Sequence, residues 1–184
     1  MLFRPLLFFV FFGIVSASGQ SFDKYSLSSD STVNSLAGIK KVYFAKRIDK
    51  RPKIDGKLND ACWENGSWSG GFIQQVPNQA KSPSQETQIK ILYDNSNLYV
   101  AFKCFDNGPG KIRSILSRRD EMAGDIAGIA LDSYHDKQTA FEFNVAASGQ
   151  KVDLVHLGAY KVDMNWDAVW DGKSQVYDSL WTSE

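Results

Sequence analysis

Short runs in which apolar and polar residues alternate recur along the chain beyond residue 40, and this period of two predicts β-strands. In the run 87–93, one face carries Thr87, Ile89, Ile91 and Tyr93, and the run 98–105 alternates in the same way. The polar residues 94–97 between the two runs have the composition of a tight turn. These two runs therefore predict a β-hairpin.

Further strands are predicted at 41–47, 126–131, 139–145, 152–156 and 168–176. In 139–145, Phe141, Phe143 and Val145 share one face, and Glu142 and Asn144 take the other. A short helix is expected at 110–117, and no long amphipathic helix pattern occurs. Many short strands with polar turns and little helix are typical of an all-β sandwich.

The N-terminal residues 1–19 have the pattern of a secretory signal peptide. Arg4 is followed by the apolar run 6–15, which is short for a membrane span, and Ala17 and Gly19 fit a cleavage site before Gln20. Cleavage after Ala17 and retention as a membrane anchor are the alternatives. Residues 20–39 are rich in serine and predict a flexible linker, so the globular domain is expected at 40–184.

The last residues, 180–184, have the sequence LWTSE, which is typical of the beginning of a strand. A sandwich that ended there would have an unfinished strand at an exposed edge. We therefore expect a fragment of a longer protein, with the sandwich truncated at its C-terminal strand.

Composition limits the range of partners and cross-links. The chain has 21 Lys and Arg against 21 Asp and Glu, so its surface offers no general attraction to nucleic acid or anionic lipid. Cys62 and Cys104 are too few for a disulfide framework. Export would permit a disulfide between them, and a buried free thiol at Cys104 is the alternative.

Carboxylates offer little catalytic or metal-binding signal. Asp132 and Asp136 flank one turn, and carboxylates in such places usually accept hydrogen bonds from turn amides. The series Asp163, Asn165 and Asp167 begins like a calcium loop, but Ala168 stands where that loop needs glycine. An irregular calcium site at these three residues stays open. Two histidines without paired cysteines do not favour zinc.

Tryptophan gives the most informative signal. Trp166 and Trp170 alternate with Asp163, Asn165, Asp167 and Asp171, and a sugar needs this mixture: an indole for its apolar C–H face and polar groups for its hydroxyls. A core position for both tryptophans is the competing interpretation. The charged run 118–121 either forms a solvated loop or supplies arginine forks to a ligand.

Several segments together resemble the family 9 carbohydrate-binding modules. The sequence IDGKLNDACW at 54–63 is similar to the opening motif of that family, ILYDNSNLYV at 91–100 to its hairpin, IALD at 129–132 to a following strand, and WTSE at 181–184 to the start of a later one. The resemblance covers about 41–184 and implies a jelly-roll-like antiparallel sandwich that binds carbohydrate.

Four further segments resemble a group of exported bacterial proteins with this module at the N-terminus, followed by a long β-rich region associated with the outer membrane. These segments are 117–120, 131–136, 141–145 and 165–171. The resemblance implies export to the periplasm, outer membrane or cell surface. The residues expected to contact a ligand are Trp166, Trp170, Arg118, Arg119, Asp120, Asn144 and Asp167.

The sequence also departs from the family. Its sugar-binding members clamp the ligand between two tryptophans, and the stretch that matches the first, 118–125, contains no aromatic residue. A carbohydrate-binding module of a cell-envelope protein, serving polysaccharide breakdown or uptake, is therefore the first expectation. A structural domain that docks on the β-rich region is the second. The sequence does not favour enzyme activity of this chain; as part of an enzyme, it would be an accessory module of a glycoside hydrolase. Haem held by Met164 and His156 is a weaker possibility because no haem-attachment motif is present.

Overall fold

The structure is a computed structural model that describes residues 11–12, 41–107, 112–158 and 161–184. The segment predicted as a signal peptide lies outside the described residues except for 11–12, and the predicted linker lies wholly outside them. The elements are β1 (Phe11–Phe12), β2 (Lys46–Arg47), the 3-10 helix η2 (Ala61–Glu64), β3 (Thr87–Tyr93), β4 (Leu98–Phe105), β5 (Ile126–Leu131), β6 (Thr139–Ala146), β7 (Lys151–Leu157), β8 (Val162–Asp163), β9 (Ser174–Val176) and β10 (Leu180–Ser183).

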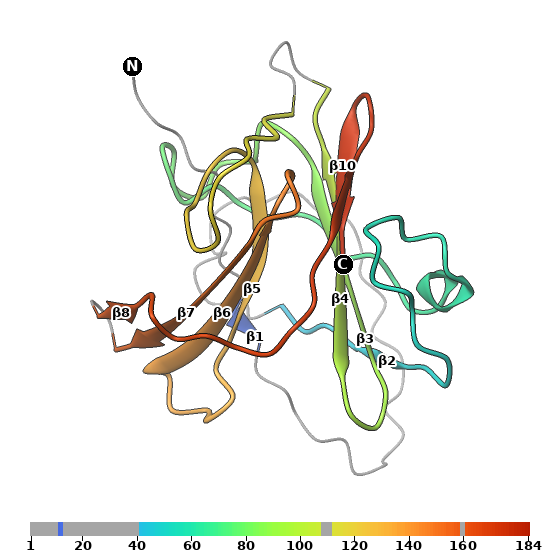
Figure 1. Cartoon of the computed structure of the whole chain (residues 1–184), viewed down its shortest axis with the longest axis horizontal. Coiled ribbons are helices and arrows are strands. Elements are labelled where there is room, and N and C mark those ends of the chain that lie inside the picture. Colours follow the sequence, from blue (N-terminus) through green and yellow to red (C-terminus); the bar gives the residue numbers. More distant parts are fainter. Residues whose placement is uncertain (1–10, 13–40, 108–111, 159–160) are drawn as a thin grey trace, which may run out of the picture.

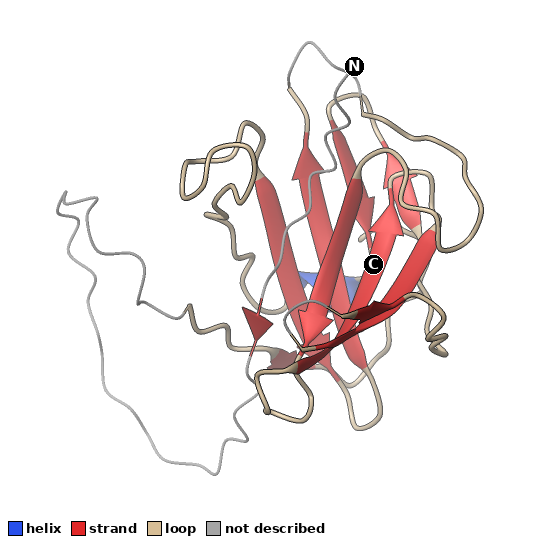
Figure 2. Cartoon of the chain, turned by 90° about the vertical axis from the view of Figure 1, so that its left-hand side faces the viewer, coloured by secondary structure: helices blue, strands red, loops and turns tan. Residues whose placement is uncertain are grey.

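Two five-stranded sheets face each other, as Figure 1 and Figure 2 show. Sheet A has the order β1-β5-β6-β7-β8, and sheet B has the order β2-β3-β4-β10-β9. The pairs are antiparallel except for β1 with β5 and β2 with β3. The predicted all-β sandwich is confirmed. Among the described residues, no helix has the length and apolar character needed to cross a membrane.

The predicted hairpin is present with the predicted bounds. Strands β3 and β4 pair from Thr87 opposite Cys104 to Tyr93 opposite Leu98. Asp94 holds the turn, since its Oδ1 accepts hydrogen bonds from the amides of Ser96 and Asn97, each at 2.7 Å. The amide of Ser96, supported by the Tyr99 hydroxyl and the Asn97 amide, keeps the pKa of Asp94 far below its usual value.

Sheet B is covered on both faces, so residues on both sides of β3 and β4 are buried. One cluster lies between the sheets and includes Ile89, Phe102, Cys104, Ile129 and Trp181. A second lies on the outer face, beneath segment 48–68, and includes Ile48, Cys62, Trp63, Leu92 and Tyr99. Cys62 and Cys104 therefore belong to different clusters, and both are buried free thiols. The disulfide considered from the sequence does not form, and burial raises the pKa of both thiols.

Three predicted elements differ from the structure. Only Lys46–Arg47 of the run 41–47 is a strand, and the described part of 110–117 contains no helix. The run 168–176 is a strand only in β9. Residues 164–173, which we call the crossing segment, instead pass from sheet A to sheet B (Figure 1). The amide of Ala168 in this segment donates to a side chain, Oδ2 of Asp153, rather than to a neighbouring strand.

The motif at 54–63 is fixed by the last residue of the sequence. The buried carboxylate of Glu184 accepts hydrogen bonds from the amides of Asp55 and Gly56, each at 2.9 Å, and from the indole of Trp63 at 2.7 Å. Gly56 has a φ of +83°, and a Cβ there would overlap the backbone of Ser174. We call this set, Glu184 with Asp55, Gly56 and Trp63, the Glu184 anchor.

Candidate functional site

The crossing segment places its two tryptophans on the inner face of sheet A. The ring centroid of Trp166 lies 4.9 Å from that of Phe141 and 5.6 Å from that of Phe143. The ring of Trp170 lies 5.4 Å from that of Phe143. Both tryptophans are half-buried. They are thus neither core residues like Trp63 nor free surface side chains.

Asp153 on β7 holds the crossing segment from below. Its side chain is fully buried, at 0% exposure, and accepts hydrogen bonds from the Ala168 amide at 2.6 Å and from Nη2 of Arg119 at 3.0 Å. Burial alone would raise the pKa of Asp153, but the Ala168 amide, the Trp170 indole and the Arg119 guanidinium together lower it. Asp153 is therefore an ionised, preorganised support for the segment between the two tryptophans.

Arg119 joins the loop before β5 to the crossing segment. Its Nη2 contacts both Asp153 and Asp167, and its Nε lies 3.6 Å from Oδ2 of Asp120. The carboxylate of Asp153, with Asp167 and Asp120 nearby, raises the pKa of Arg119. The structure therefore brings Arg119 and Asp120 to Asp167, which lies next to Trp166 in the crossing segment; that these residues contact a ligand stays a prediction. Arg118 is exposed, and its amide donates to Glu121.

Lys151 completes the surroundings of Trp170. Its Nζ donates to the carbonyl oxygen of Trp170 at 2.6 Å and lies 4.9 Å from the centroid of the indole. The Nε1 of Trp170 is buried and makes no hydrogen bond within the described part of the chain, although the indole is close enough to Asp153 to favour its ionised form.

Trp170 also borders a cavity of about 570 Å³ between the two sheets. The volume falls in the range of small-ligand sites. Its wall is mostly apolar, and the residues from β4, β5 and β6 that line it include Val100, Phe102, Ile129, Leu131 and Phe143. Polar groups come from Ser96, Asn97, Asp171 and Glu184. The cavity offers an apolar floor with a few polar groups beside a tryptophan.

Asn144 does not join this site. It alternates with Phe143 along β6 and therefore lies on the opposite face of sheet A, where its Nδ2 donates to Oε1 of Glu142 at 2.9 Å. Gly128 faces it on β5, and a Cβ there would overlap the Asn144 amide. The prediction that Asn144 contacts the same ligand as Trp166 finds no support in this placement.

The calcium site considered from the sequence is not assembled either. Oδ1 of Asp163 accepts hydrogen bonds from the amide of Asn165 at 2.9 Å and from its side chain at 3.2 Å, which closes a local turn. Asp167 turns instead toward Arg119. Among the described residues, no group of three His, Cys, Asp or Glu side chains is placed to hold a metal ion.

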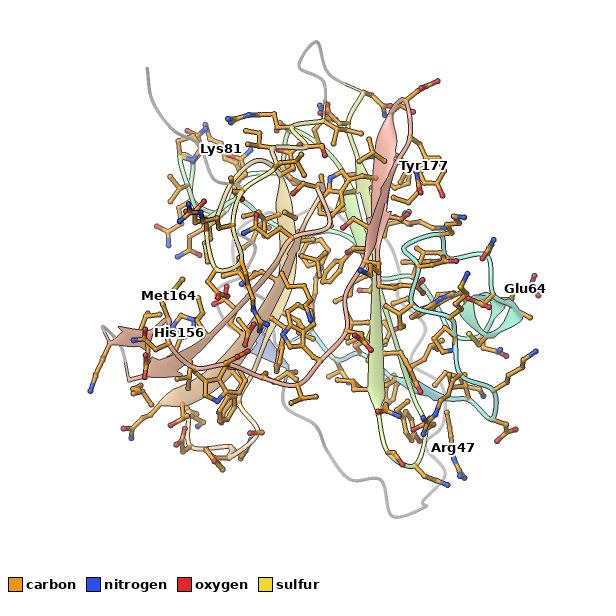
Figure 3. All side chains as sticks on the ribbon, viewed as in Figure 1. Arg47, Glu64, Lys81, His156, Met164 and Tyr177 are labelled. Atoms are coloured by element: carbon orange, nitrogen blue, oxygen red, sulfur yellow. The ribbon has the colours of Figure 1, made fainter. Side chains whose placement is uncertain are left out.

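The carboxylates of the 132–136 turn and the imidazole of His156 have local structural partners. Asp132 accepts the amides of Asp136 and Lys137, and Asp136 accepts those of Gln138 and Thr139, so both carboxylates stabilise one turn. Nε2 of His156 lies 2.5 Å from Oε2 of Glu142. Figure 3 places His156 and Met164, the pair weighed for haem, at the β7–β8 end of sheet A.

Sequence reasoning missed Asp153 and Lys151, the two residues that support Trp170 and its segment. The signal for Asp153 was an acidic residue inside the apolar run 152–155. Buried charges of this kind are paired or hydrogen-bonded, so its position could have predicted a partner.

A comparison with protein families shows to which family the chain belongs. The profile described as carbohydrate family 9 binding domain-like matches residues 54–154, more than half of the sequence. The chain belongs to this family. The matched span begins beside the anchor residues Asp55 and Gly56 and ends just beyond Asp153, so Glu184 and the crossing segment lie outside it. No curated protein and no solved structure shows a significant match.

Proposed function

We propose that this family 9 domain binds carbohydrate at the crossing segment, against the inner face of sheet A. The observation that carries the proposal is the convergence of two half-buried tryptophans, Trp166 and Trp170, with the charged set Arg119, Asp153 and Asp167. Membership of the family supports the same ligand class.

The chemistry of the site suits a sugar. A pyranose ring has an apolar C–H face and a polar rim, so it needs an aromatic surface next to oriented donors and acceptors. Trp170 borders the cavity and supplies such a surface. Asp171 at the cavity and the exposed carboxylate of Asp167 supply acceptors for hydroxyl groups.

The supports beneath the tryptophans reduce the entropic cost of binding. The Ala168 amide lies two residues from each tryptophan and is fixed to Asp153, which Arg119 also holds. A site whose groups are ordered before the ligand arrives loses less conformational freedom on binding. Asp153 thus acts as a positioning residue, and the two tryptophans act as the contact residues.

A glycan panel with the full chain tests the proposal, using saturable retention and its competition by free sugar as the readout. We expect Trp170→Ala to weaken the affinity for the retained glycan by about 5-fold to 150-fold, because stacking on one aromatic ring contributes on the order of 1–3 kcal/mol. Trp68→Ala is the matched control, since Trp68 is also half-buried but lies between Lys90 and Lys103 on the outer face of sheet B.

Two results would contradict the proposal. Absence of retention across the panel would remove carbohydrate binding as the function. Retention that Trp68→Ala abolishes and Trp170→Ala leaves within about twofold would move the site to the outer face of sheet B.

We also propose that the chain is exported and serves a longer cell-envelope protein in polysaccharide breakdown or uptake, on the basis of the pattern in residues 1–19 and the family resemblance. Cleavage before Gln20 would remove β1 and expose the edge of β5 at Ala130 and Leu131. N-terminal sequencing of the protein from its source cell tests this: a mature start at Gln20 is expected, and a retained Met1 in a soluble cellular fraction would contradict it.

A further inference from the structure

The basic and acidic side chains around the crossing segment differ in how freely they can contact a ligand. The Nη2 of Arg119 already contacts Asp153 and Asp167, and Lys151 already donates to the Trp170 carbonyl while lying over the indole. Both bases are therefore engaged within the site. An anionic ligand would have to compete with buried or nearby carboxylates for the same cations.

The carboxylates keep free acceptor capacity. The side chain of Asp167 is 72% exposed and uses Oδ1 for Arg119, and the side chain of Asp120 is 40% exposed. Asp171 is exposed and lines the cavity beside Trp170. With Asp153 and Glu121, these residues give five negative charges against the four positive charges of Arg118, Arg119, Lys151 and Lys173, and no Lys or Arg among the described residues lines the cavity. A surface with this excess attracts cations and repels anions.

An aromatic ring beside carboxylates is also a known arrangement for recognising ammonium groups, because the ring face and the carboxylate both attract the positive charge. Trp170 and Asp171 line the same cavity. Arg47, a base on the hairpin side, donates to Asn95 and does not line the cavity.

We propose that the site selects its ligand by charge and prefers a saccharide that carries protonated amines, followed by its neutral counterpart, and that it rejects uronates. This inference rests on the proposed function, because it specifies the ligand class of the same site.

Calorimetric titration of the full chain with three oligosaccharides of equal length tests the inference: a glucosamine oligomer, an N-acetylglucosamine oligomer and a galacturonic acid oligomer. At about pH 6 the sugar amine is protonated and the uronate is ionised. We expect the amine to bind about fivefold more tightly than the N-acetyl form and the uronate to bind most weakly, as exposed ion pairs of this kind allow. High salt should bring the first two affinities together.

Asp171→Asn should reduce the preference for the amine over the N-acetyl form to about half, because it removes one exposed acceptor charge. Asp178→Asn is the matched control. It makes the same charge change in the turn between β9 and β10, next to Tyr177. Figure 3 shows Tyr177 far from His156 and Met164, which mark the β7–β8 end of sheet A. We expect this control to leave the preference unchanged.

The outcomes separate this inference from the function on which it rests. A uronate that binds as tightly as the amine, or an N-acetyl form that binds more tightly than the amine, overturns the charge preference. A domain that retains a neutral glycan of the panel but does not bind the glucosamine oligomer contradicts this inference alone. A domain that binds no glycan at all overturns both.

Discussion

The Glu184 anchor and the crossing segment are held by the same kind of hydrogen bond but have different roles. Each fixes a loop to a sheet through a buried carboxylate that accepts a backbone amide, and each lies beside a tryptophan. In the anchor, Trp63 is 4% exposed and donates to Glu184. In the crossing segment, Trp170 is half-buried, borders a cavity and has a buried Nε1 without a hydrogen-bond partner in the described part of the chain.

The difference shows which tryptophans are free to act on a ligand. The polar groups of the anchor named above already have partners inside the protein, including the carboxylate of Glu184 at the cavity wall, so we assign the anchor to the stability of the fold. The crossing segment presents an incompletely buried ring and exposed carboxylates. The motif at 54–63 therefore belongs to the structural part of the domain, and the two candidate contact tryptophans lie beyond the matched span, whereas Arg119 and Asp153, which support them, lie within it.

The largest expected effect is that of Trp63→Ala, which removes a buried indole and leaves one oxygen of Glu184 without its partner. We expect the free energy of unfolding in urea to fall by about 3–5 kcal/mol. Trp63→Phe keeps most of the packing and should cost about 1–2 kcal/mol for the lost hydrogen bond. If the folded Trp63→Phe variant loses glycan affinity as Trp170→Ala does, the distinction between the two regions is wrong.

Compared with Trp63→Ala, Asp153→Asn should lower the free energy of unfolding less and the glycan affinity more. The change removes the anion that Arg119 and the Ala168 amide share, and hydrogen bonds to a charged group contribute about 1.5–3 kcal/mol. We expect a loss of about 2 kcal/mol in unfolding free energy, with a change in the near-ultraviolet circular dichroism of the tryptophans. Asp178→Asn serves as the surface control, and equal effects from both variants would exclude the positioning role of Asp153.

Lys90→Met is expected to leave the fold unchanged or to stabilise it by about 1 kcal/mol, because a buried charge is replaced by an apolar chain of similar length. Lys90 is 2% exposed, and its Nζ donates to the Trp63 carbonyl at 2.7 Å. Burial, with the charge of Lys103 nearby, lowers its pKa. The wild type should therefore gain stability as pH rises from this lowered pKa toward 10.5, and the variant should not. A strong loss of stability in urea would contradict this expectation and would show that the hydrogen bond from Lys90 to the Trp63 carbonyl is needed for the fold.

The smallest expected effect concerns pH: the contributions of Asp153 and Glu184 to the free energy of unfolding should change with pH in opposite directions. The pKa of Asp153 lies below 3.8 in the folded protein, so its stabilisation is complete above that value and is lost as pH falls through the folded pKa. Burial raises the pKa of Glu184 above 4.5, so stability falls as pH rises from 4.5 through the folded pKa. Unfolding free energies of Asp153→Asn and Glu184→Gln across the acid range should each lack one of these slopes. If both variants keep the wild-type profile, neither carboxylate carries the assigned role.

Much of the fold was predictable because its strands have a strong local pattern. The bounds of β3, β4 and β5 agree with the prediction, since β3 and β4 alternate, β5 is a short apolar run, and turn residues flank all three. The second half of the crossing segment was predicted as part of a strand over 168–176, but the amide of Ala168 donates to the side chain of Asp153, which is distant in sequence. The local pattern of apolar and polar residues cannot show a hydrogen bond between residues so far apart in the sequence.

The candidate site was predictable only in part. Tryptophans next to carboxylates indicated the crossing segment, and the paired arginines indicated the loop that contacts it. Asn144 was assigned to the same site although its alternation with Phe143 places it on the other face of the sheet. Period-two alternation, applied to β6 as it was to β3, would have separated these two residues.

The central claim is that the crossing segment binds the glycan and that the anchor does not. Nuclear magnetic resonance of the five tryptophan indole N–H signals during glycan titration tests it most directly. We expect the signals of Trp166 and Trp170 to shift with saturable binding while that of Trp63 stays in place. Shifts confined to Trp63 or Trp68, at a glycan concentration that saturates the protein, would contradict the account.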